Sequence, residues 1–83
     1  MKVELRYFAS VREALGRASE SRETRATTLG QLRQELVAQG EPYAQALAPG
    51  RAVRLALDQV MSEETAALRE GAEVAFFPPV TGG

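Results

Sequence analysis

The chemistry that this sequence can offer is concentrated in its last six residues, Pro78, Pro79, Val80, Thr81, Gly82 and Gly83. The two prolines cannot continue a β-ladder, because proline has no N–H to donate and its φ angle is fixed. We therefore expect an extended arm, roughly 18 Å long at about 3.1 Å per residue. Its tip offers only the α-carboxylate of Gly83, which suits insertion into the active site of another protein. The alternative is a terminus that is loose because nothing anchors it.

Several kinds of chemistry are excluded by residue types that the sequence lacks. The 83 residues include neither cysteine nor histidine, which removes disulfides, thiol and imidazole nucleophiles and most transition-metal sites. No P-loop or G-x-G-x-x-G motif is present, so any ATP must be bound by a partner. We also find no paired carboxylates placed for acid–base catalysis. We therefore expect no metal site, no cofactor bound by this chain and no enzyme activity of the chain alone.

Charge and hydropathy limit the partners in the same way. The net charge is −1 and no basic block is present, which argues against a nucleic-acid partner. No apolar run approaches the length needed to cross a membrane. The first four residues alternate charged and apolar side chains, unlike a signal peptide. We therefore expect a cytoplasmic protein that contacts no membrane.

The arm must be positioned by strands, which are predicted from alternating apolar residues. Such alternation occurs over residues 2–8, with Val3, Leu5 and Tyr7 on one face, and over residues 51–57. A polar edge strand is expected within residues 18–25. A tight reversal at Asp58-Gln59 leads to a short strand at residues 60–61. After a loop closed by Gly71, the last strand covers residues 73–77, with Val74 and Phe76 facing inward.

Three helices are predicted from capping signals and helical periodicity. Ser10 and Glu13 form a capping box that opens a short helix, and Gly16 is placed to close it. Thr28 and Gln31 form a second capping box, which opens the main helix. Its apolar stripe, which runs to Gly40, consists of Leu29, Leu32, Leu36 and Val37. A third, short helix is expected after Pro42.

This order of elements predicts an α+β protein with the β-grasp arrangement of ubiquitin-like proteins. A mixed sheet of about five strands would wrap around one main helix, with short extra helices. The last strand would pair in parallel with the first at the centre of the sheet. We expect one β-grasp domain over residues 1–77 and a flexible tail over residues 78–83.

The same alternation leaves large apolar side chains on the helix-free face of the sheet. Phe8 and Phe77 would lie there near the base of the arm, and Met61 could join them. Such a cluster beside a protruding arm indicates a partner surface; the alternative is a minor core under loops. Arg12, just beyond Phe8, is a candidate for an ion pair with a partner, or a solvated surface residue. The arginines expected on a solvated sheet surface are Arg22, Arg25, Arg51 and Arg54.

Two segments carry a resemblance to a known family. Tyr7-Phe8-Ala9-Ser10-Val11-Arg12-Glu13-Ala14-Leu15-Gly16 and the ending Glu73-Val74-Ala75-Phe76-Phe77-Pro78-Pro79-Val80-Thr81-Gly82-Gly83 are similar to the small, sulfur-carrying subunits of molybdopterin synthases. These proteins belong to the ubiquitin-like MoaD/ThiS family. The resemblance covers the whole chain in length and order of elements. One departure is Leu57-Asp58, where many relatives have Val-Asn; Asp suits a turn about as well as Asn.

The resemblance implies a cycle of chemistry at Gly83. A ubiquitin-activating-type enzyme would adenylate its carboxylate with ATP, and a persulfide sulfur donor would then displace AMP to leave a thiocarboxylate. The modified tail would enter the large synthase subunit and give sulfur to cyclic pyranopterin monophosphate. Two carriers serve each dithiolene, which implies a heterotetramer. Glycine at positions 82 and 83 puts no Cβ near the carbonyl, so attack is unhindered.

Two other functions remain open at this point. One is a carrier in the same family that serves thiamine thiazole synthesis, or a ubiquitin-like protein modifier. The other is a β-grasp interaction module whose tail is chemically inert. The Phe77-to-Gly83 ending favours the molybdopterin synthase carrier.

Overall fold

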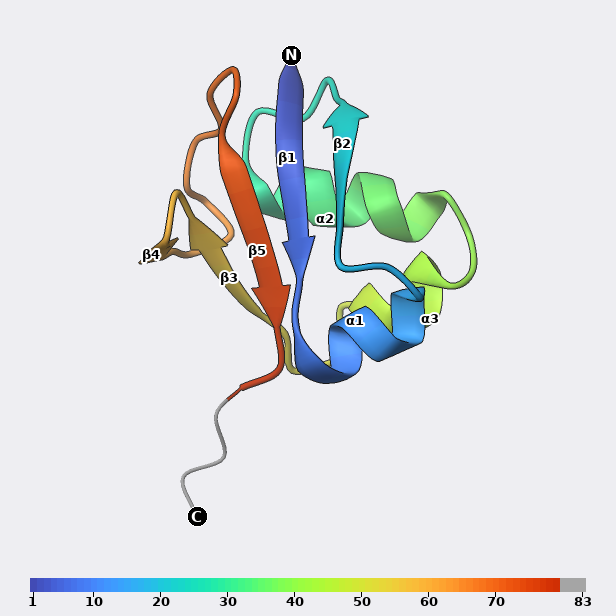
Figure 1. Ribbon diagram of the computed structural model, residues 1–83. Coiled ribbons are helices and arrows are strands. Elements are labelled where there is room, and N and C mark those ends of the chain that lie inside the picture. Colours follow the sequence, from blue (N-terminus) through green and yellow to red (C-terminus); the bar gives the residue numbers. More distant parts are fainter. Residues whose placement is uncertain (80–83) are drawn as a thin grey trace.

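A computed structural model describes residues 1–79 of the chain (Figure 1). Within this range the chain forms five strands and three helices. In chain order these are β1 (Lys2–Tyr7), α1 (Ala9–Leu15), β2 (Ser19–Glu23), α2 (Leu29–Ala38), α3 (Tyr43–Leu47), β3 (Arg54–Leu57), β4 (Val60–Met61) and β5 (Glu73–Phe77).

The five strands form one mixed sheet in the order β2-β1-β5-β3-β4. β1 and β5 lie side by side and run in the same direction, with Leu5 opposite Val74 and Tyr7 opposite Phe76. The other pairs, β1 with β2, β3 with β5, and β3 with β4, are antiparallel. The predicted β-grasp arrangement, with the last strand parallel to the first at the centre, is confirmed.

The core lies between one face of the sheet and the helices. Val3, Leu5 and Tyr7 on β1 and Val74 and Phe76 on β5 alternate with exposed or half-buried residues and are almost fully buried. The helix α2 contributes the stripe expected from its periodicity, with Leu29, Leu32 and Leu36 buried and Val37 half-buried. The helices thus cover one face of the sheet and leave the other face open (Figure 1).

The structure contradicts the capping box predicted at Ser10 and Glu13. The helix α1 begins at Ala9, with Phe8 as its N-cap and no side-chain cap, so Ser10 lies inside the first turn. The cause is tertiary, because the Phe8 N–H donates to the Phe76 carbonyl at 3.0 Å and carries the parallel pairing to the last residue before the helix. The predicted end at Gly16 is confirmed; this residue has φ +74°, which favours glycine.

The start of α2 agrees with its sequence signal, with one change of partner. The Thr28 hydroxyl accepts a hydrogen bond from the Gln31 N–H at 3.2 Å. The Gln31 side chain reaches back to the N–H of Thr27 at 2.8 Å, rather than to that of Thr28. The predicted reversal before β4 is also present, since Asp58 and Gln59 have φ of +50° and +70°, as a tight hairpin turn requires.

The strand β3 begins three residues later than predicted, at Arg54, and the cause is a buried arginine on α2. Arg33 is only 6% exposed, and its guanidinium donates to the carbonyls of Leu47, Ala48 and Arg51 at 2.8–3.0 Å. These bonds hold residues 48–51 in a turn, so the extended chain cannot start before that turn ends. Arg33 also pairs with Glu64 at 2.8 Å.

The expectation of four solvated arginines on the sheet surface is wrong in part. Arg22 on β2 faces α2, where its Nε donates to the Glu35 carboxylate at 2.9 Å. Arg25 and Arg51 are exposed but lie in loops. Only Arg54, on β3, is an exposed arginine of the sheet surface among these four. Alternation places a residue on a face, but the helix packed over that face decides whether water reaches it.

Candidate functional site

The predicted site begins where β5 ends, at Phe77. β1 and β5 are parallel and end at the same edge of the sheet, beside α1 (Figure 1). Pro78 and Pro79 follow and are half-buried. The remaining residues of the predicted tail, Val80, Thr81, Gly82 and Gly83, lie outside the described residues.

The two phenylalanines expected on the open face are brought together at this edge. The rings of Phe8 and Phe77 meet edge to face, with centroids 6.3 Å apart and planes at 85°. Phe8 is 43% exposed, although Phe residues are usually buried. We call this pair the aromatic patch. Phe77 immediately precedes Pro78, so the aromatic patch lies at the start of the predicted tail.

Met61 lies on the same open face but in the next row of residues. Ala56 on β3 is opposite Met61 on β4 and Ala75 on β5, whereas Arg54 on β3 is opposite Phe77 on β5. Met61 is 53% exposed. It therefore extends the apolar surface away from the aromatic patch across two alanines. Its role in partner binding remains a prediction, as does that of the patch.

Arg12 lies on α1 and its side chain is exposed. Within residues 1–79 it forms no ion pair. Its backbone N–H donates to the Phe8 carbonyl at 3.3 Å, so the helix ties this residue to the aromatic patch. The geometry leaves its guanidinium available to a partner, and its proposed ion pair stays a prediction.

A polar cluster that sequence reasoning missed lies on the other face, behind the end of β1. Tyr7 and Tyr43 both donate to Oε2 of Glu20, at 2.7 and 2.6 Å, and Arg17 donates to Oε1 at 3.0 Å. The Tyr7 ring also packs on Phe76, with centroids 5.7 Å apart. The cluster thus joins β1, β2 and α3 directly behind the last residues of β5. No local sequence signal pairs these three elements.

The hydrogen bonds of this cluster shift the pKa values of its members. Burial opposes ionisation of Glu20, but the hydrogen bonds from Tyr43 and Tyr7 and the charge of Arg17 outweigh it and lower the pKa of the carboxyl. Burial, together with the hydrogen bond to the Glu20 carboxylate, raises the pKa of both Tyr7 and Tyr43. The cluster is therefore a carboxylate held between two neutral phenols, which stabilises the fold at neutral pH.

Over residues 1–79, no three acidic side chains converge in a way that could hold a metal ion. None of the helices in that range is long and apolar enough to cross a membrane.

The sheet, its parallel central pair and the single main helix define the chain as a ubiquitin-like β-grasp protein. Its sequence specifies the family: residues 5–83 match the ThiS family, and the chain belongs to it.

Individual relatives agree with this assignment. The chain is 38% identical to a molybdopterin synthase sulfur carrier subunit from Escherichia coli (strain K12), over 98% of this chain and 99% of the relative. It is 36% identical to the subunit of the same name from Haemophilus influenzae, over 93% and 94%. Among solved structures, it resembles a chain in the protein–protein complex of subunits 1 and 2 of the molybdopterin-converting factor from Helicobacter pylori 26695. That match has a TM-score of 0.68 and 25% identity and covers 100% of both chains.

Proposed function

We propose that Gly83 carries sulfur as a C-terminal thiocarboxylate and that residues 78–83 form the arm that delivers it. The chain is a sulfur carrier subunit of molybdopterin synthase, on the strength of two relatives of that name matched over nearly their full length. The observation that carries the assignment of Gly83 is the match to the ThiS family, which extends through the Gly-Gly ending to residue 83. The body of the protein, residues 1–77, then serves as the part that partners recognise.

The chemistry at Gly83 needs three steps before sulfur can be donated. A free carboxylate is a poor electrophile, so its oxygen first attacks the α-phosphorus of ATP and pyrophosphate leaves. The terminal sulfur of a persulfide then attacks the acyl adenylate and AMP leaves. A thiol reduces the resulting acyl disulfide and releases the thiocarboxylate. Donation to cyclic pyranopterin monophosphate, followed by hydrolysis, returns the Gly83 carboxylate.

These steps assign the catalytic groups to other proteins. The chain acts as a co-substrate and not as an enzyme by itself. The proposed partners are an adenylating enzyme of the ubiquitin-activating type, which binds ATP, a persulfide sulfur donor, and the large subunit of molybdopterin synthase. The Helicobacter complex of subunits 1 and 2 supports the last of these. In this scheme Phe8, Phe77, Met61 and Arg12 contact a partner, Pro78 to Gly82 thread its active site, and the cycle runs in the cytoplasm.

Deletion of Gly83 tests the proposal directly. We expect the truncated chain to support no molybdopterin formation in a reconstituted synthase assay, because the reacting carbonyl is then misplaced. We expect its thermal unfolding midpoint to stay unchanged, since no core residue is removed. A chain lengthened by one residue after Gly83 is the matched control for tail length and should also be inactive. Sulfur transfer by either variant would refute the proposal.

Intact-mass analysis provides a second, independent measurement. With an adenylating enzyme, Mg-ATP and a sulfur donor, the chain should gain the mass difference of one oxygen replaced by sulfur, located on Gly83 by fragmentation. Before sulfur is added, hydroxylamine should trap the activated carboxyl at the same residue. Labelling of an internal Asp or Glu, or ATP turnover by the chain alone, would overturn the assignment. Activation only by a thiamine-pathway enzyme would favour the alternative carrier function.

A further inference from the structure

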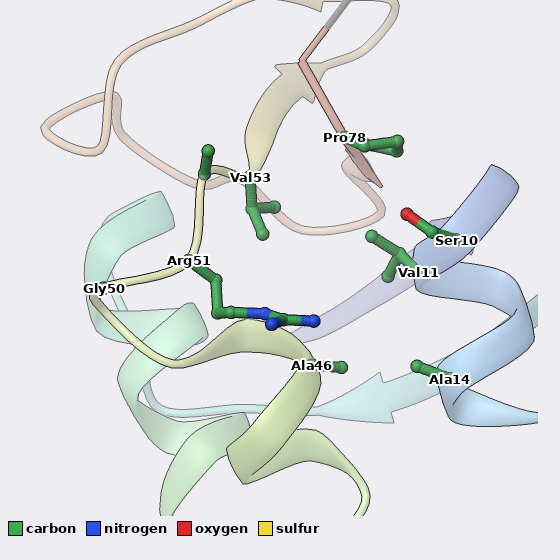
Figure 2. Close-up of a pocket in the computed structure, with 9 residues that line it drawn as sticks. Ser10, Val11, Ala14, Ala46, Gly50, Arg51, Val53 and Pro78 are labelled. Atoms are coloured by element: carbon green, nitrogen blue, oxygen red, sulfur yellow. The ribbon is translucent and has the colours of Figure 1, made fainter.

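A groove of about 350 Å³ opens beside the point where the chain leaves β5. One wall is α1, with Ser10, Val11 and Ala14; the opposite wall is the loop before β3, and Pro78 lies at the rim (Figure 2). Most of the lining side chains are small, so the groove is bounded closely by the backbone of α1 and of the loop. The groove is therefore wide enough for a side chain of another protein, and it is continuous with the base of the tail.

Arg51 is the charged residue of this groove. Its side chain extends from the loop across the groove toward α1 (Figure 2). Arg51 is exposed and forms no ion pair with any residue of the range 1–79. Its backbone is held firmly, because the Arg51 carbonyl accepts from buried Arg33 at 3.0 Å and the Arg51 N–H donates to the Ala48 carbonyl at 2.8 Å. The fold thus fixes the base of a cationic side chain and leaves its charge unmatched.

The charges around the base of the tail are mainly positive. Arg12 on α1 and Arg54 on β3, which is opposite Phe77, are also exposed and also form no ion pair within residues 1–79. By contrast, Arg6, Arg17, Arg22, Arg33 and Arg69 each pair with a carboxylate of this chain. No carboxylate lines the groove, and Glu13 is the one acidic residue of α1. Although the net charge of the chain is −1, the end that a tail-receiving protein approaches therefore offers cations to it.

We propose that this groove receives an acidic side chain of the large synthase subunit, with its carboxylate on the guanidinium of Arg51. The inference rests on the proposed function, because it takes the large subunit as the protein that receives the tail. Two observations support this occupant: the groove is continuous with Pro78, and its one charge is positive and unmatched by the described residues. Arg also suits a carboxylate better than Lys, since its planar fork can form two parallel hydrogen bonds.

Calorimetric titration of the full-length chain with the large subunit tests the proposal. Arg51→Glu reverses the charge and should raise Kd by about tenfold or more, as expected when a matched charge is replaced by a like charge. Arg51→Lys keeps the charge but loses the planar fork, so its affinity should lie between those of Arg51→Glu and the wild type. Arg25→Glu is the matched control, since Arg25 is also exposed and unpaired within residues 1–79 but lies in the loop after β2, away from Pro78. It should bind as the wild type does.

A second variant tests the groove without changing any charge. Ala14 is exposed on α1 and lines the groove, and leucine is a good helix former. Ala14→Leu should therefore fold normally, fill part of the groove and weaken binding to the large subunit. Wild-type affinity for both Arg51→Glu and Ala14→Leu would overturn the proposal.

The thiocarboxylate measured by intact mass separates this inference from the proposed function. We expect Arg51→Glu to acquire the thiocarboxylate as the wild type does, because the groove is assigned to the large subunit and not to the activating enzyme. If the variant binds the large subunit normally but is adenylated poorly, the occupant belongs to the activating enzyme and the proposal is wrong. If the wild type itself forms no thiocarboxylate, the proposed function fails, whatever the titrations show.

Discussion

The two faces of β5 differ in what they contact, although their residues alternate along one strand. Val74 and Phe76 are 0% exposed and pack against the helices. Ala75 and Phe77, on the opposite face, are half-buried and have no helix over them. The first face holds the fold together, and the second lies open beside the tail. Substitutions one residue apart should therefore change different properties of the protein.

The aromatic patch lies on the open face, and this determines how much it contributes to the stability of the fold. Burial of apolar area stabilises a fold only if the unfolded chain exposes that area and the folded chain does not. Phe8 keeps 43% of its surface in water after folding, so it contributes less to stability than a fully buried ring and keeps that area for association. The aromatic patch, in which Phe8 is exposed and Phe77 half-buried beside Pro78, is therefore our predicted docking surface.

The largest expected effect of a core substitution is that of Phe76→Ala. Removal of this fully buried ring leaves a cavity between the sheet and the helices, and such changes cost about 3–5 kcal/mol. Chemical denaturation should show a strongly lowered midpoint. Phe77→Ala is the matched control, because it removes the same side chain from the adjacent position on the other face. Equal destabilisation by the two variants would show that the assignment of faces is wrong.

The next effect should appear in binding and not in stability. Phe8→Ala should weaken association with the large subunit by about 1 kcal/mol, less than the roughly 1.5–3 kcal/mol for a fully exposed Phe, because folding already buries part of the ring. Its unfolding free energy should change far less than that of Phe76→Ala, because the ring is already 43% exposed. Titration with the large subunit and chemical denaturation of both Phe8→Ala and Phe76→Ala compare the two faces of the sheet directly. If Phe8→Ala binds with wild-type affinity, the aromatic patch is not the docking surface.

A smaller effect, on the dependence of stability on pH, should come from the cluster behind β5. The pKa of Glu20 is lower in the folded chain than in the unfolded chain. Its contribution is therefore present above the unfolded value, about 4.3, and is lost as the pH falls through the folded value. Denaturation midpoints measured at neutral pH and at acid pH should fall less steeply for Glu20→Gln than for the wild type.

Part of the loss of folding stability at acid pH should remain in Glu20→Gln. Burial opposes the ionisation of Glu35, but hydrogen bonds from Thr24 and Arg22 lower the pKa of this carboxyl as well. Glu35→Gln should therefore remove a separate part of the decline, and the double variant should show the flattest profile. An unchanged slope in Glu20→Gln would mean that the two tyrosines do not hold the charged carboxylate.

The smallest effect is expected at the opposite end of β5, in the turn before β4. The Asp58 carboxylate accepts from the Glu73 N–H at 3.0 Å and from Arg69 at 3.2 Å. Asn can accept the same backbone hydrogen bond and tolerates a φ of +50°. Asp58→Asn should thus unfold at nearly the wild-type temperature, and Asp58→Ala at a lower one. A lower midpoint for Asn than for Ala would contradict this role of the side chain.

Much of the fold could be predicted because its signals are local. Alternation with a period of two determines which side chains share a face of a strand, and it correctly separates Phe76 from Phe77. Gly16 and the Asp58-Gln59 turn are predictable from the backbone conformations that such positions require. The function is indicated by the ending itself, because its resemblance to sulfur carriers lies in consecutive residues and the family match extends to Gly83.

The contacts that tertiary structure decided join residues far apart in the chain. Tyr7 and Tyr43 reach Glu20 across 13 and 23 positions, and Arg33 reaches Glu64 across 31. No periodicity specifies such partners, because they depend on how strands and helices pack. The same reason explains the wrong capping box, since the pairing of Phe8 with Phe76 set the start of α1. The sequence by itself determined the faces and the turns and indicated the functional ending, whereas packing alone placed Arg51 and Pro78 around one groove.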